Sequence, residues 1–163
     1  DNEKAKQAMK KMVDICKANQ QKIAFTLSDL FCVDRHRDSF KELIYKDVDI
    51  LFGNQEEFPA MVNSKKLDDG IAYAKSLKKL SIITLANKGS LIISDEKVLE
   101  INAESVTQVI DTTGAGDLFA AGFLYGMTHQ KNLKESGRLA SIAAAEIISH
   151  FGVRPKVRLS SLI

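Results

Sequence analysis

Short apolar runs alternate along the chain with longer stretches in which apolar residues recur every three or four positions. Runs of the first kind predict β-strands, and stretches of the second kind predict amphipathic helices. The strand-like runs are Ile23–Ser28, Val48–Phe52, Ser81–Leu85, Ser90–Ser94 and Lys97–Ile101. The last two flank Asp95-Glu96 so closely that they predict a β-hairpin.

Helical periodicity fills the intervals between these runs. The expected helices cover residues 3–20, 35–46, 67–79, 115–127 and 132–150, with a short helix starting near Gln55. Asp34 is the expected cap of the second helix. Asn132 and Glu135 have the spacing of a capping box before the last helix, and Gly152 is a natural helix stop.

The first and last helices each carry an apolar stripe, which is expected to lie on an apolar surface. The stripes are Ala5, Ala8, Met9, Met12, Val13 and Cys16 in the first helix, and Leu139, Ala140, Ala143, Ala144, Ile147 and Ile148 in the last. Because strands and helices alternate, we expect an α/β fold: a doubly wound, mostly parallel sheet with helices on both faces and one β-hairpin. Ligands bind such sheets at the carboxyl ends of the strands.

The composition is that of one globular domain and excludes several classes of function. Of the 163 residues, 45% are apolar and 27% charged, so the chain can bury a core without disulfides or metals. The net charge of +2 is too small to indicate nucleic acid or an anionic membrane as partner. No apolar run approaches the roughly 20 residues of a membrane span, and no signal peptide is visible. Since Cys16 and Cys32 are too few for a disulfide scaffold, we expect buried, reduced thiols and a cytoplasmic location.

The strongest chemical signal is the segment Asp111-Thr112-Thr113-Gly114-Ala115-Gly116-Asp117, which precedes an apolar helix. Its glycines lack a Cβ, so their backbone N–H groups can approach a ligand closely at the positive end of that helix. The segment is therefore a candidate anion site with Asp117 beside it. A carboxylate there can accept the proton of an attacking hydroxyl during phosphoryl transfer. The simpler alternative is that Asp117 only caps the helix.

This segment resembles the DTxGAGD signature of the ribokinase-like (PfkB) carbohydrate and nucleoside kinases, and the match is complete. The resemblance implies that Asp117 is the catalytic base, and that the amides of Gly114, Ala115 and Gly116 form the anion hole. It also implies ATP and Mg²⁺ as cofactors. The expected reaction is the ATP-dependent phosphorylation of a hydroxyl group of a sugar or nucleoside.

A second strand end resembles another element of the same family. After the Val48–Phe52 run, Asn54 and Glu57 match the family's Asn-x-x-Glu element, which helps to position Mg²⁺ and the nucleotide phosphates. Carboxylate and amide oxygens suit this hard cation, often through water. The same spacing is also that of an ordinary capping box. Pro59 implies that the helix starts late or is kinked.

The third strand end is similar to the family's Thr-x-Gly-x-x-Gly turn, which lies along the nucleotide. Thr84, Asn87 and Gly89 are the candidate nucleotide contacts. Ala86 departs from the pattern, because a glycine is usual at its position. The alternative is a plain turn that leads into the hairpin.

The resemblance implies two further binding regions. Several relatives bind a monovalent cation near the start of the Gly-rich motif, so Asp111 and Thr113 are candidates to bind K⁺. Ala144, Ile148 and Gly152 are candidates to wall the adenine, although burial alone explains them equally well.

Other polar residues have structural interpretations. His36 is interpreted as part of a charged, solvated helix start, and His129 and His150 as isolated residues. Lys78-Lys79 is interpreted as surface charge, and no group of His and Cys residues has the spacing of a zinc site.

Members of the family are considerably longer than this chain. Residues 1–163 are therefore expected to be the carboxyl-terminal, nucleotide-binding part of such a kinase, with the acceptor-binding half and lid absent. The runs LSDLFCVDRHRDSF and DILFGNQEEF are most similar to bacterial adenosine-kinase-type members. A homo-oligomer, or a missing amino-terminal half, is the expected macromolecular partner. The alternatives are a non-catalytic nucleotide-binding module and a half-kinase that completes its sheet with another chain.

Overall fold

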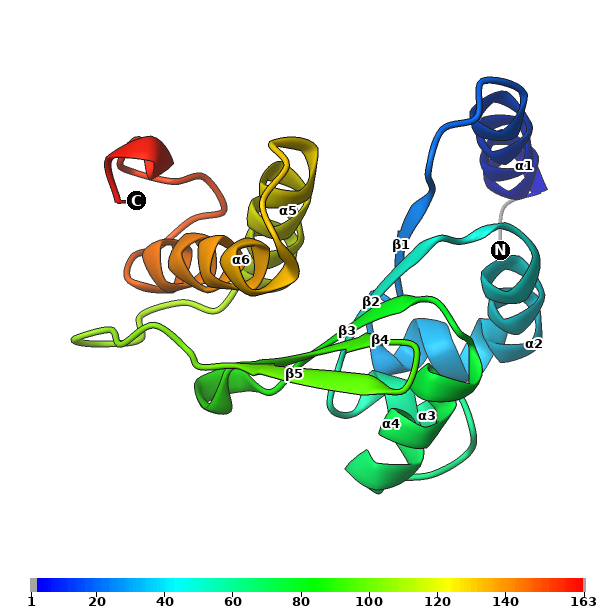
Figure 1. Ribbon diagram of the computed structural model, residues 1–163, viewed down its shortest axis with the longest axis horizontal. Coiled ribbons are helices and arrows are strands. Elements are labelled where there is room, and N and C mark those ends of the chain that lie inside the picture. The colour runs from blue at the N-terminus through cyan, green and yellow to red at the C-terminus, as the bar shows by residue number, and fades with distance from the viewer. Residues whose placement is uncertain (1–2, 163) are drawn as a thin grey trace.

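A five-stranded sheet forms the centre of the molecule in the computed structural model, which describes residues 3–162. The strands lie in chain order: β1 (Ala24–Thr26), β2 (Ile50–Asn54), β3 (Leu80–Thr84), β4 (Ser90–Ser94) and β5 (Lys97–Ile101). The first three strands are parallel, whereas β4 and β5 each run antiparallel to the strand before them. The predicted hairpin is confirmed, and each of the three earlier runs forms a strand (Figure 1).

Helices connect the strands and cover the sheet. Within the described residues they are α1 (Glu3–Ala18), α2 (Leu30–Asp47), α3 (Glu57–Ala60), α4 (Leu67–Ser76), α5 (Ala115–Thr128) and α6 (Leu133–Ile148), with short 3-10 turns η1 (Ala86–Lys88) and η2 (Leu159–Ser161). Pro59 lies inside α3, which is only four residues long, as expected for a helix containing this residue. Across residues 3–162, no helix combines the length and the apolar character that a membrane crossing requires.

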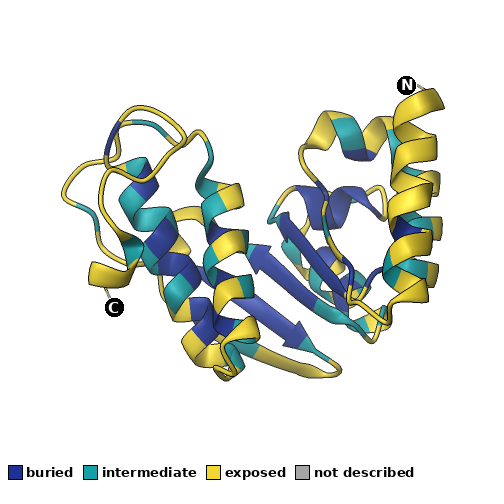
Figure 2. Ribbon diagram, turned by 90° about the horizontal axis from the view of Figure 1, so that it is seen from above, coloured by how far each residue is buried: buried dark blue, intermediate teal, exposed yellow. Residues whose placement is uncertain are grey.

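The central strands β2, β3 and β4 are buried on both faces of the sheet, to which successive side chains of a strand point alternately. On one face, Leu51 and Ile83 belong to an apolar core shared with α2, α3 and α4. On the other face, Phe52 and Ile82 belong to a second core, which includes Phe123 of α5 and residues of α6. Figure 2 shows the buried strands between these two helical layers. This is the doubly wound α/β arrangement that the alternating pattern predicts.

The helices α5 and α6 pack closely because α5 has glycines where α6 approaches. A Cβ atom at Gly122 would lie 2.8 Å from the carbonyl oxygen of Leu139, and one at Gly126 would lie 2.6 Å from Ser136 Oγ. The capping box of Asn132 and Glu135 at the start of α6 is confirmed. The predicted stripe of α6 is buried at Ala140, Ala143 and Ile147 and half-buried at Leu139, Ala144 and Ile148.

The prediction for the start of α2 is wrong. The helix begins at Leu30, and its cap is Asp29, whose side chain accepts a hydrogen bond from Cys32 N at 2.7 Å. An extended backbone conformation at Asp29 makes this bond possible, so Asp34 lies inside the helix. His36 is also inside the helix, at a kink with φ −123° and ψ 16°, and not in a solvated helix start.

The first helix is less buried than its apolar stripe predicts. Only Val13 is buried, whereas Met9 and Met12 are 42% and 51% exposed. The helix reaches the core through Val13 and the half-buried Cys16 alone, so most of its stripe remains uncovered. Cys16 and Cys32 are free thiols as expected, but both are half-buried and not fully buried.

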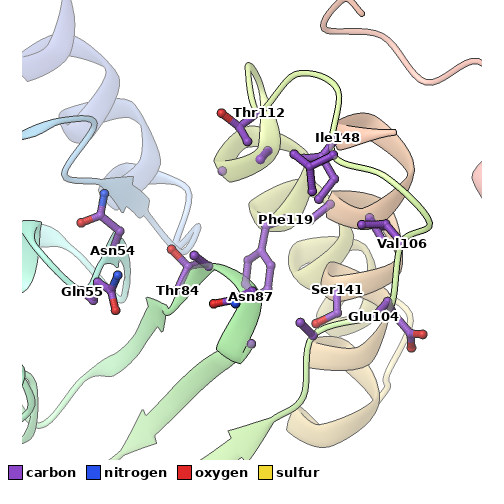
Figure 3. Close-up of a pocket in the computed structure, with 18 of the residues that line it drawn as sticks. Asn54, Gln55, Thr84, Asn87, Glu104, Val106, Thr112, Phe119, Ser141 and Ile148 are labelled. Atoms are coloured by element: carbon purple, nitrogen blue, oxygen red, sulfur yellow. The ribbon is translucent and has the colours of Figure 1, made fainter. Parts of the chain in front are cut away.

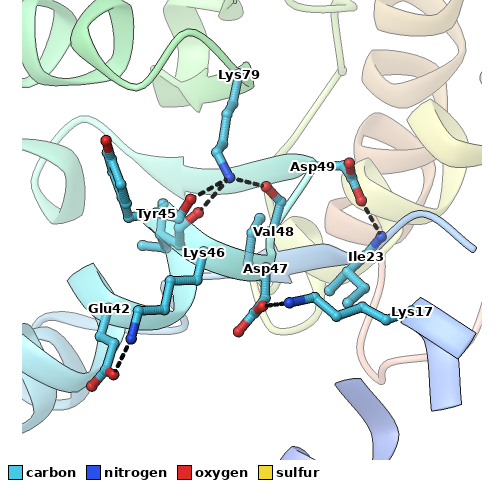
Figure 4. Close-up of polar contacts among 10 residues, drawn as sticks. Lys17, Ile23, Glu42, Tyr45, Lys46, Asp47, Val48, Asp49 and Lys79 are labelled. Atoms are coloured by element: carbon cyan, nitrogen blue, oxygen red, sulfur yellow. Dashed lines mark hydrogen bonds and ion pairs between the residues drawn. The ribbon is translucent and has the colours of Figure 1, made fainter. Parts of the chain in front are cut away.

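Lys79 is a helix cap and not the surface charge that its sequence context suggests. Its Nζ donates hydrogen bonds to the carbonyl oxygens of Ile44, Tyr45 and Val48, at 2.7, 3.0 and 2.6 Å (Figure 4). These carbonyls belong to the last turn of α2, where backbone acceptors lack helical partners and the helix dipole is negative. Because Lys79 directly precedes β3, it connects the carboxyl end of α2 to the start of that strand.

We expect Lys79→Met to lower the free energy of unfolding by about 2 kcal/mol, because it removes hydrogen bonds from a charged donor to three carbonyls. Urea unfolding of the purified protein measures this difference. Lys78→Met is the matched control, since Lys78 is exposed, and we expect it to change stability by less than about 0.5 kcal/mol. Equal effects of the two substitutions would show that Lys79 does not cap α2.

Candidate active site

The carboxyl ends of β2 and β3 lie side by side and bring two predicted site residues together. In the parallel register, Asn54 at the end of β2 is opposite Thr84 at the end of β3. The next residue continues the pairing, since Gln55 N donates to Thr84 O at 3.0 Å. The two strand ends therefore form one edge, as expected for the ligand side of an open α/β sheet.

A cavity of about 800 Å³ lies between this edge and the helices α5 and α6. Predicted site residues that line it are Asn54, Thr84, Asn87, Gly89, Ala115, Gly116, Ala144 and Ile148. In Figure 3, Asn54 and Thr84 come from the strand side of the cavity, while Ile148 comes from the opposite side. The predicted residues outside its lining are Glu57, Asp111, Thr113, Gly114, Asp117 and Gly152.

The start of α5 presents free backbone donors to the cavity. Gly114 adopts the left-handed conformation, with φ 82°, just before the helix. Ala115 N donates to Thr112 O at 3.1 Å, which closes this turn. Within residues 3–162, neither Gly116 N–H nor Asp117 N–H has a hydrogen-bond acceptor. Because α5 has 14 residues, these two groups lie at the positive end of a long helix dipole and suit an anion.

Asp117 lies on the same first turn as these donors. Its side chain is exposed, and among the described residues no group donates a hydrogen bond to its carboxylate. The carboxylate thus lacks the backbone hydrogen bonds of a capping side chain, although its place in the first turn also lets the helix dipole favour its charge. The Asp117 carboxylate is instead available to a group that approaches from solvent or from a bound molecule.

Asp111 and Thr113 shape the loop that leads into α5. One oxygen of Asp111, Oδ1, accepts hydrogen bonds from Thr113 N at 2.9 Å and Thr113 Oγ1 at 2.6 Å. These bonds lower the pKa of the Asp111 carboxyl below its usual value, and the Gly152 N–H and the nearby His150 act in the same direction. The carboxylate is therefore held in its charged form at the start of the motif.

Asn54 and Glu57 bind each other in the reciprocal pattern of a capping box. Asn54 Oδ1 accepts from Glu57 N at 2.9 Å, while Glu57 Oε2 accepts from Asn54 N at 3.0 Å. A third bond joins Asn54 Nδ2 to Glu57 Oε1 at 2.6 Å. Burial is the main cause that raises the pKa of Glu57, opposed by the Asn54 N–H, with Asp29 and Glu56 raising it further. The capping alternative thus describes the geometry of this pair correctly.

The geometry of Asn54 and Glu57 determines whether this pair could coordinate Mg²⁺ directly. Both carboxylate oxygens of Glu57 already accept hydrogen bonds from Asn54, and Glu57 is only 5% exposed. Among the described residues, no three His, Cys, Asp or Glu side chains form a group that could hold a metal ion. The pair therefore does not fit direct coordination of Mg²⁺. It fits a role through water, because each carboxylate oxygen retains a second acceptor position.

The turn between β3 and β4 contains two residues with a positive φ, Ala86 and Gly89. Gly89 has φ 91°, and a Cβ atom on it would lie 1.9 Å from Ile101 O, so no other residue fits. Ala86 also adopts a left-handed conformation, with φ 54°. Ala86 therefore occupies a backbone conformation that glycine adopts without strain and that costs an alanine about 1–2 kcal/mol.

Several residues of the cavity were not predicted from the sequence. They are Gln55, Glu56, Ala86, Ala103, Glu104, Ser105, Val106, Val109, Thr112, Phe119, Ser141 and Ala145. Five of them belong to the segment 103–109, which has no regular secondary structure and therefore no periodicity from which to predict it. Phe119 had a detectable signal, because it lies three residues after Gly116 on one face of α5.

Comparison with known proteins identifies the family. Residues 2–158 match the pfkB family carbohydrate kinases, and the chain belongs to this family. A ribokinase from Lactococcus lactis is 31% identical over 142 residues, which cover 85% of this chain and 43% of the relative. A nucleoside kinase from Methanocaldococcus jannaschii is 32% identical over 111 residues, which cover 67% of this chain and 35% of the relative.

Solved structures confirm the expected fold. The adenosine kinase from Sinorhizobium meliloti is 38% identical, with a TM-score of 0.93 over 97% of this chain and 49% of that one. The adenosine kinase from Schistosoma mansoni, solved in complex with 2-fluoroadenosine, is 29% identical, with a TM-score of 0.80 over 92% of this chain and 49% of that one. The chain thus spans about half the length of these two relatives.

We expect Ala86→Gly to raise the free energy of unfolding by about 0.5–1 kcal/mol. Glycine at this position would remove the strain of about 1–2 kcal/mol that the left-handed conformation costs alanine. Part of this gain is lost because glycine raises the conformational entropy of the unfolded chain. Thermal and urea unfolding measure the change.

The matched control is Ala72→Gly in the middle of α4, where the residue is exposed and helical. The same chemical change there should lower stability by about 1 kcal/mol. If both substitutions destabilised the protein, Ala86 would not carry strain.

Proposed function

We propose that this chain is the carboxyl-terminal, nucleotide-binding part of an ATP-dependent kinase that phosphorylates a hydroxyl of a sugar or nucleoside. The observation that carries the proposal is the pair of free N–H groups, from Gly116 and Asp117, at the start of α5 beside the cavity. Membership of the carbohydrate kinase family agrees with it. The acceptor-binding half is proposed to lie outside residues 1–163.

The cavity suits a nucleotide because its lining combines apolar side chains with polar ones. Val106, Ala144 and Ile148 offer an apolar surface, on which a purine ring can pack. Thr84 and Asn87 lie on the strand side, where the ribose and phosphates of ATP would extend toward the start of α5. A cavity of about 800 Å³ is in the range of small-molecule and cofactor sites.

The proposed reaction places the γ-phosphoryl group at the start of α5. The acceptor oxygen bonds to the γ-phosphorus as the bond between that phosphorus and the oxygen bridging to ADP breaks. Asp117 accepts the proton of the acceptor hydroxyl. Its carboxylate is available for this role, because no described residue donates a hydrogen bond to it. The N–H groups of Gly116 and Asp117, with that of Gly114, stabilise the charge on the transferring group.

In this proposal, Asn54 and Glu57 would hold Mg²⁺ through water, and the cation would neutralise charge on the phosphates. Asp111 and Thr113 are proposed to bind a monovalent cation such as K⁺ near the loop. A fructokinase from Vibrio cholerae with the same fold, at 19% identity, was solved with fructose, ADP and a calcium ion. That structure supports a nucleotide and a hard cation as ligands compatible with the fold.

The acceptor is proposed to be adenosine or a related nucleoside, with ribose as the alternative. The support is the likeness of almost the whole chain to adenosine kinases from Sinorhizobium meliloti and Schistosoma mansoni. The ribokinase of Lactococcus lactis supports the ribose alternative.

Asp117→Ala in the full-length enzyme should lower the turnover number by at least about 100-fold, because the acceptor hydroxyl loses its general base. The dissociation constant for Mg·ATP should change little, since the N–H donors of α5 remain. Coupled assays of ADP formation and calorimetric titration measure the two quantities.

Asp68→Ala is the matched control, because Asp68 is an exposed acid in the first turn of α4. It should leave turnover unchanged. Normal turnover in Asp117→Ala would contradict the assignment of the base, and ADP formation that ignores the acceptor would favour a nucleotide-binding module.

A further inference from the structure

A buried carboxylate outside the proposed reaction holds the segment that follows α6. The side chain of Glu146 is only 8% exposed. Its Oε1 accepts hydrogen bonds from Lys156 N at 2.8 Å and Val157 N at 3.3 Å, and it lies 3.0 Å from His150 Nε2. One oxygen atom therefore fixes both ends of the loop 150–157. His150 is accordingly not the isolated residue that the sequence suggests.

The loop 150–157 in turn lies against the Gly-rich motif. The backbone N–H of Gly152 lies near enough to the carboxylate of Asp111 to help lower its pKa. Val153 covers Gly114, because a Cβ atom on Gly114 would lie 3.5 Å from Val153 Cβ. The motif is also anchored just before this loop, since Ile148 O accepts from Ile110 N at 2.8 Å and from Asp111 N at 3.4 Å.

These contacts form a continuous path from α6 to the anion site. Glu146 accepts hydrogen bonds from the loop, the loop lies against Asp111 and Gly114, and these residues belong to the turn that precedes Gly116 N–H and Asp117 N–H. Hydrogen bonds to a charged acceptor are the strong ones, so loss of this carboxylate should release the loop. Preorganised donors lose their effect when the supporting backbone moves.

We propose that Glu146 is a positioning residue, which fixes the Asp111–Asp117 loop for phosphate binding by clamping the loop 150–157 against it. The expected consequence for catalysis rests on the proposed function. The structural part of the proposal, that Glu146 holds the loop 150–157 against the Asp111–Asp117 loop, does not depend on it. No direct contact between Glu146 and a substrate is part of it. A purely local role, in which Glu146 holds the tail of the chain and nothing more, is the alternative.

Amide hydrogen exchange of the full-length protein separates the two roles. Glu146→Ala should accelerate exchange by about tenfold both in residues 150–157 and in residues 110–117, and leave β2 and β3 unchanged. Acceleration in 150–157 alone would overturn the proposal. Ile147→Val is the control, because Ile147 is fully buried in the neighbouring position of α6 and touches the core. It should not accelerate exchange in 110–117 selectively.

Nucleotide affinity gives a second readout that does not depend on turnover. The dissociation constant for Mg·ATP should rise roughly tenfold in Glu146→Ala, the scale expected for lost charge-assisted hydrogen bonds, and stay unchanged in Ile147→Val. In active enzyme, the KM for the acceptor should not change. If the wild-type protein binds Mg·ATP but transfers no phosphoryl group, the proposed function fails while this test of Glu146 stands.

Glu146→Gln keeps the test decisive if Glu146→Ala does not fold. The amide retains one acceptor oxygen but loses the charge, so we expect about threefold effects on exchange in 110–117 and on Mg·ATP affinity. Wild-type exchange in 110–117 together with faster exchange in 150–157 would contradict the proposal in this variant too.

Discussion

The parallel register between β2 and β3 determines where the site can form. It aligns Asn54 with Thr84, so the segments that follow the two strands leave the sheet at one edge. Both strands are buried on both faces, which holds this edge rigidly between two helical layers. The cavity lies at this edge, and its other wall is built by α5 and α6. A slip in the register would separate the turn at Gly89 from Asn54 and remove the strand side of the cavity.

The second wall depends on how α5 and α6 are joined. Glycines at positions 122 and 126 let the two helices approach closely, which brings Ile148 at the end of α6 to the start of the Gly-rich motif. The motif therefore receives its shape from both sides, from its own turn at Gly114 and from the segment after α6. This explains how the N–H groups of Gly116 and Asp117 can keep their positions although, among the described residues, neither has a hydrogen-bond acceptor.

The sequence predicts the parts of this structure that depend on local patterns. The strands, the hairpin and the capping box of α6 follow from alternation and spacing, and the family follows from one motif. The rest depends on contacts between distant residues. Lys79 caps α2 across 31 to 35 positions, and Glu146 binds Lys156 through a loop without periodicity. The apolar stripe of α1 shows a different limit of the sequence. An amphipathic pattern indicates a face that could pack against other residues, but most of this face is exposed in the structure.

The chain therefore combines free N–H donors at the start of α5, an adjacent free carboxylate and a cavity of about 800 Å³ at one edge of a sheet. The central claim is that this edge transfers a phosphoryl group to a hydroxyl. The most direct test gives the full-length protein ATP labelled in the γ-phosphate, together with adenosine, other nucleosides and ribose one at a time. The account predicts that the label appears in a phosphate ester of one acceptor, with one ADP formed for each ester. Label that stays in ATP, or that appears only as inorganic phosphate with every acceptor, would contradict it.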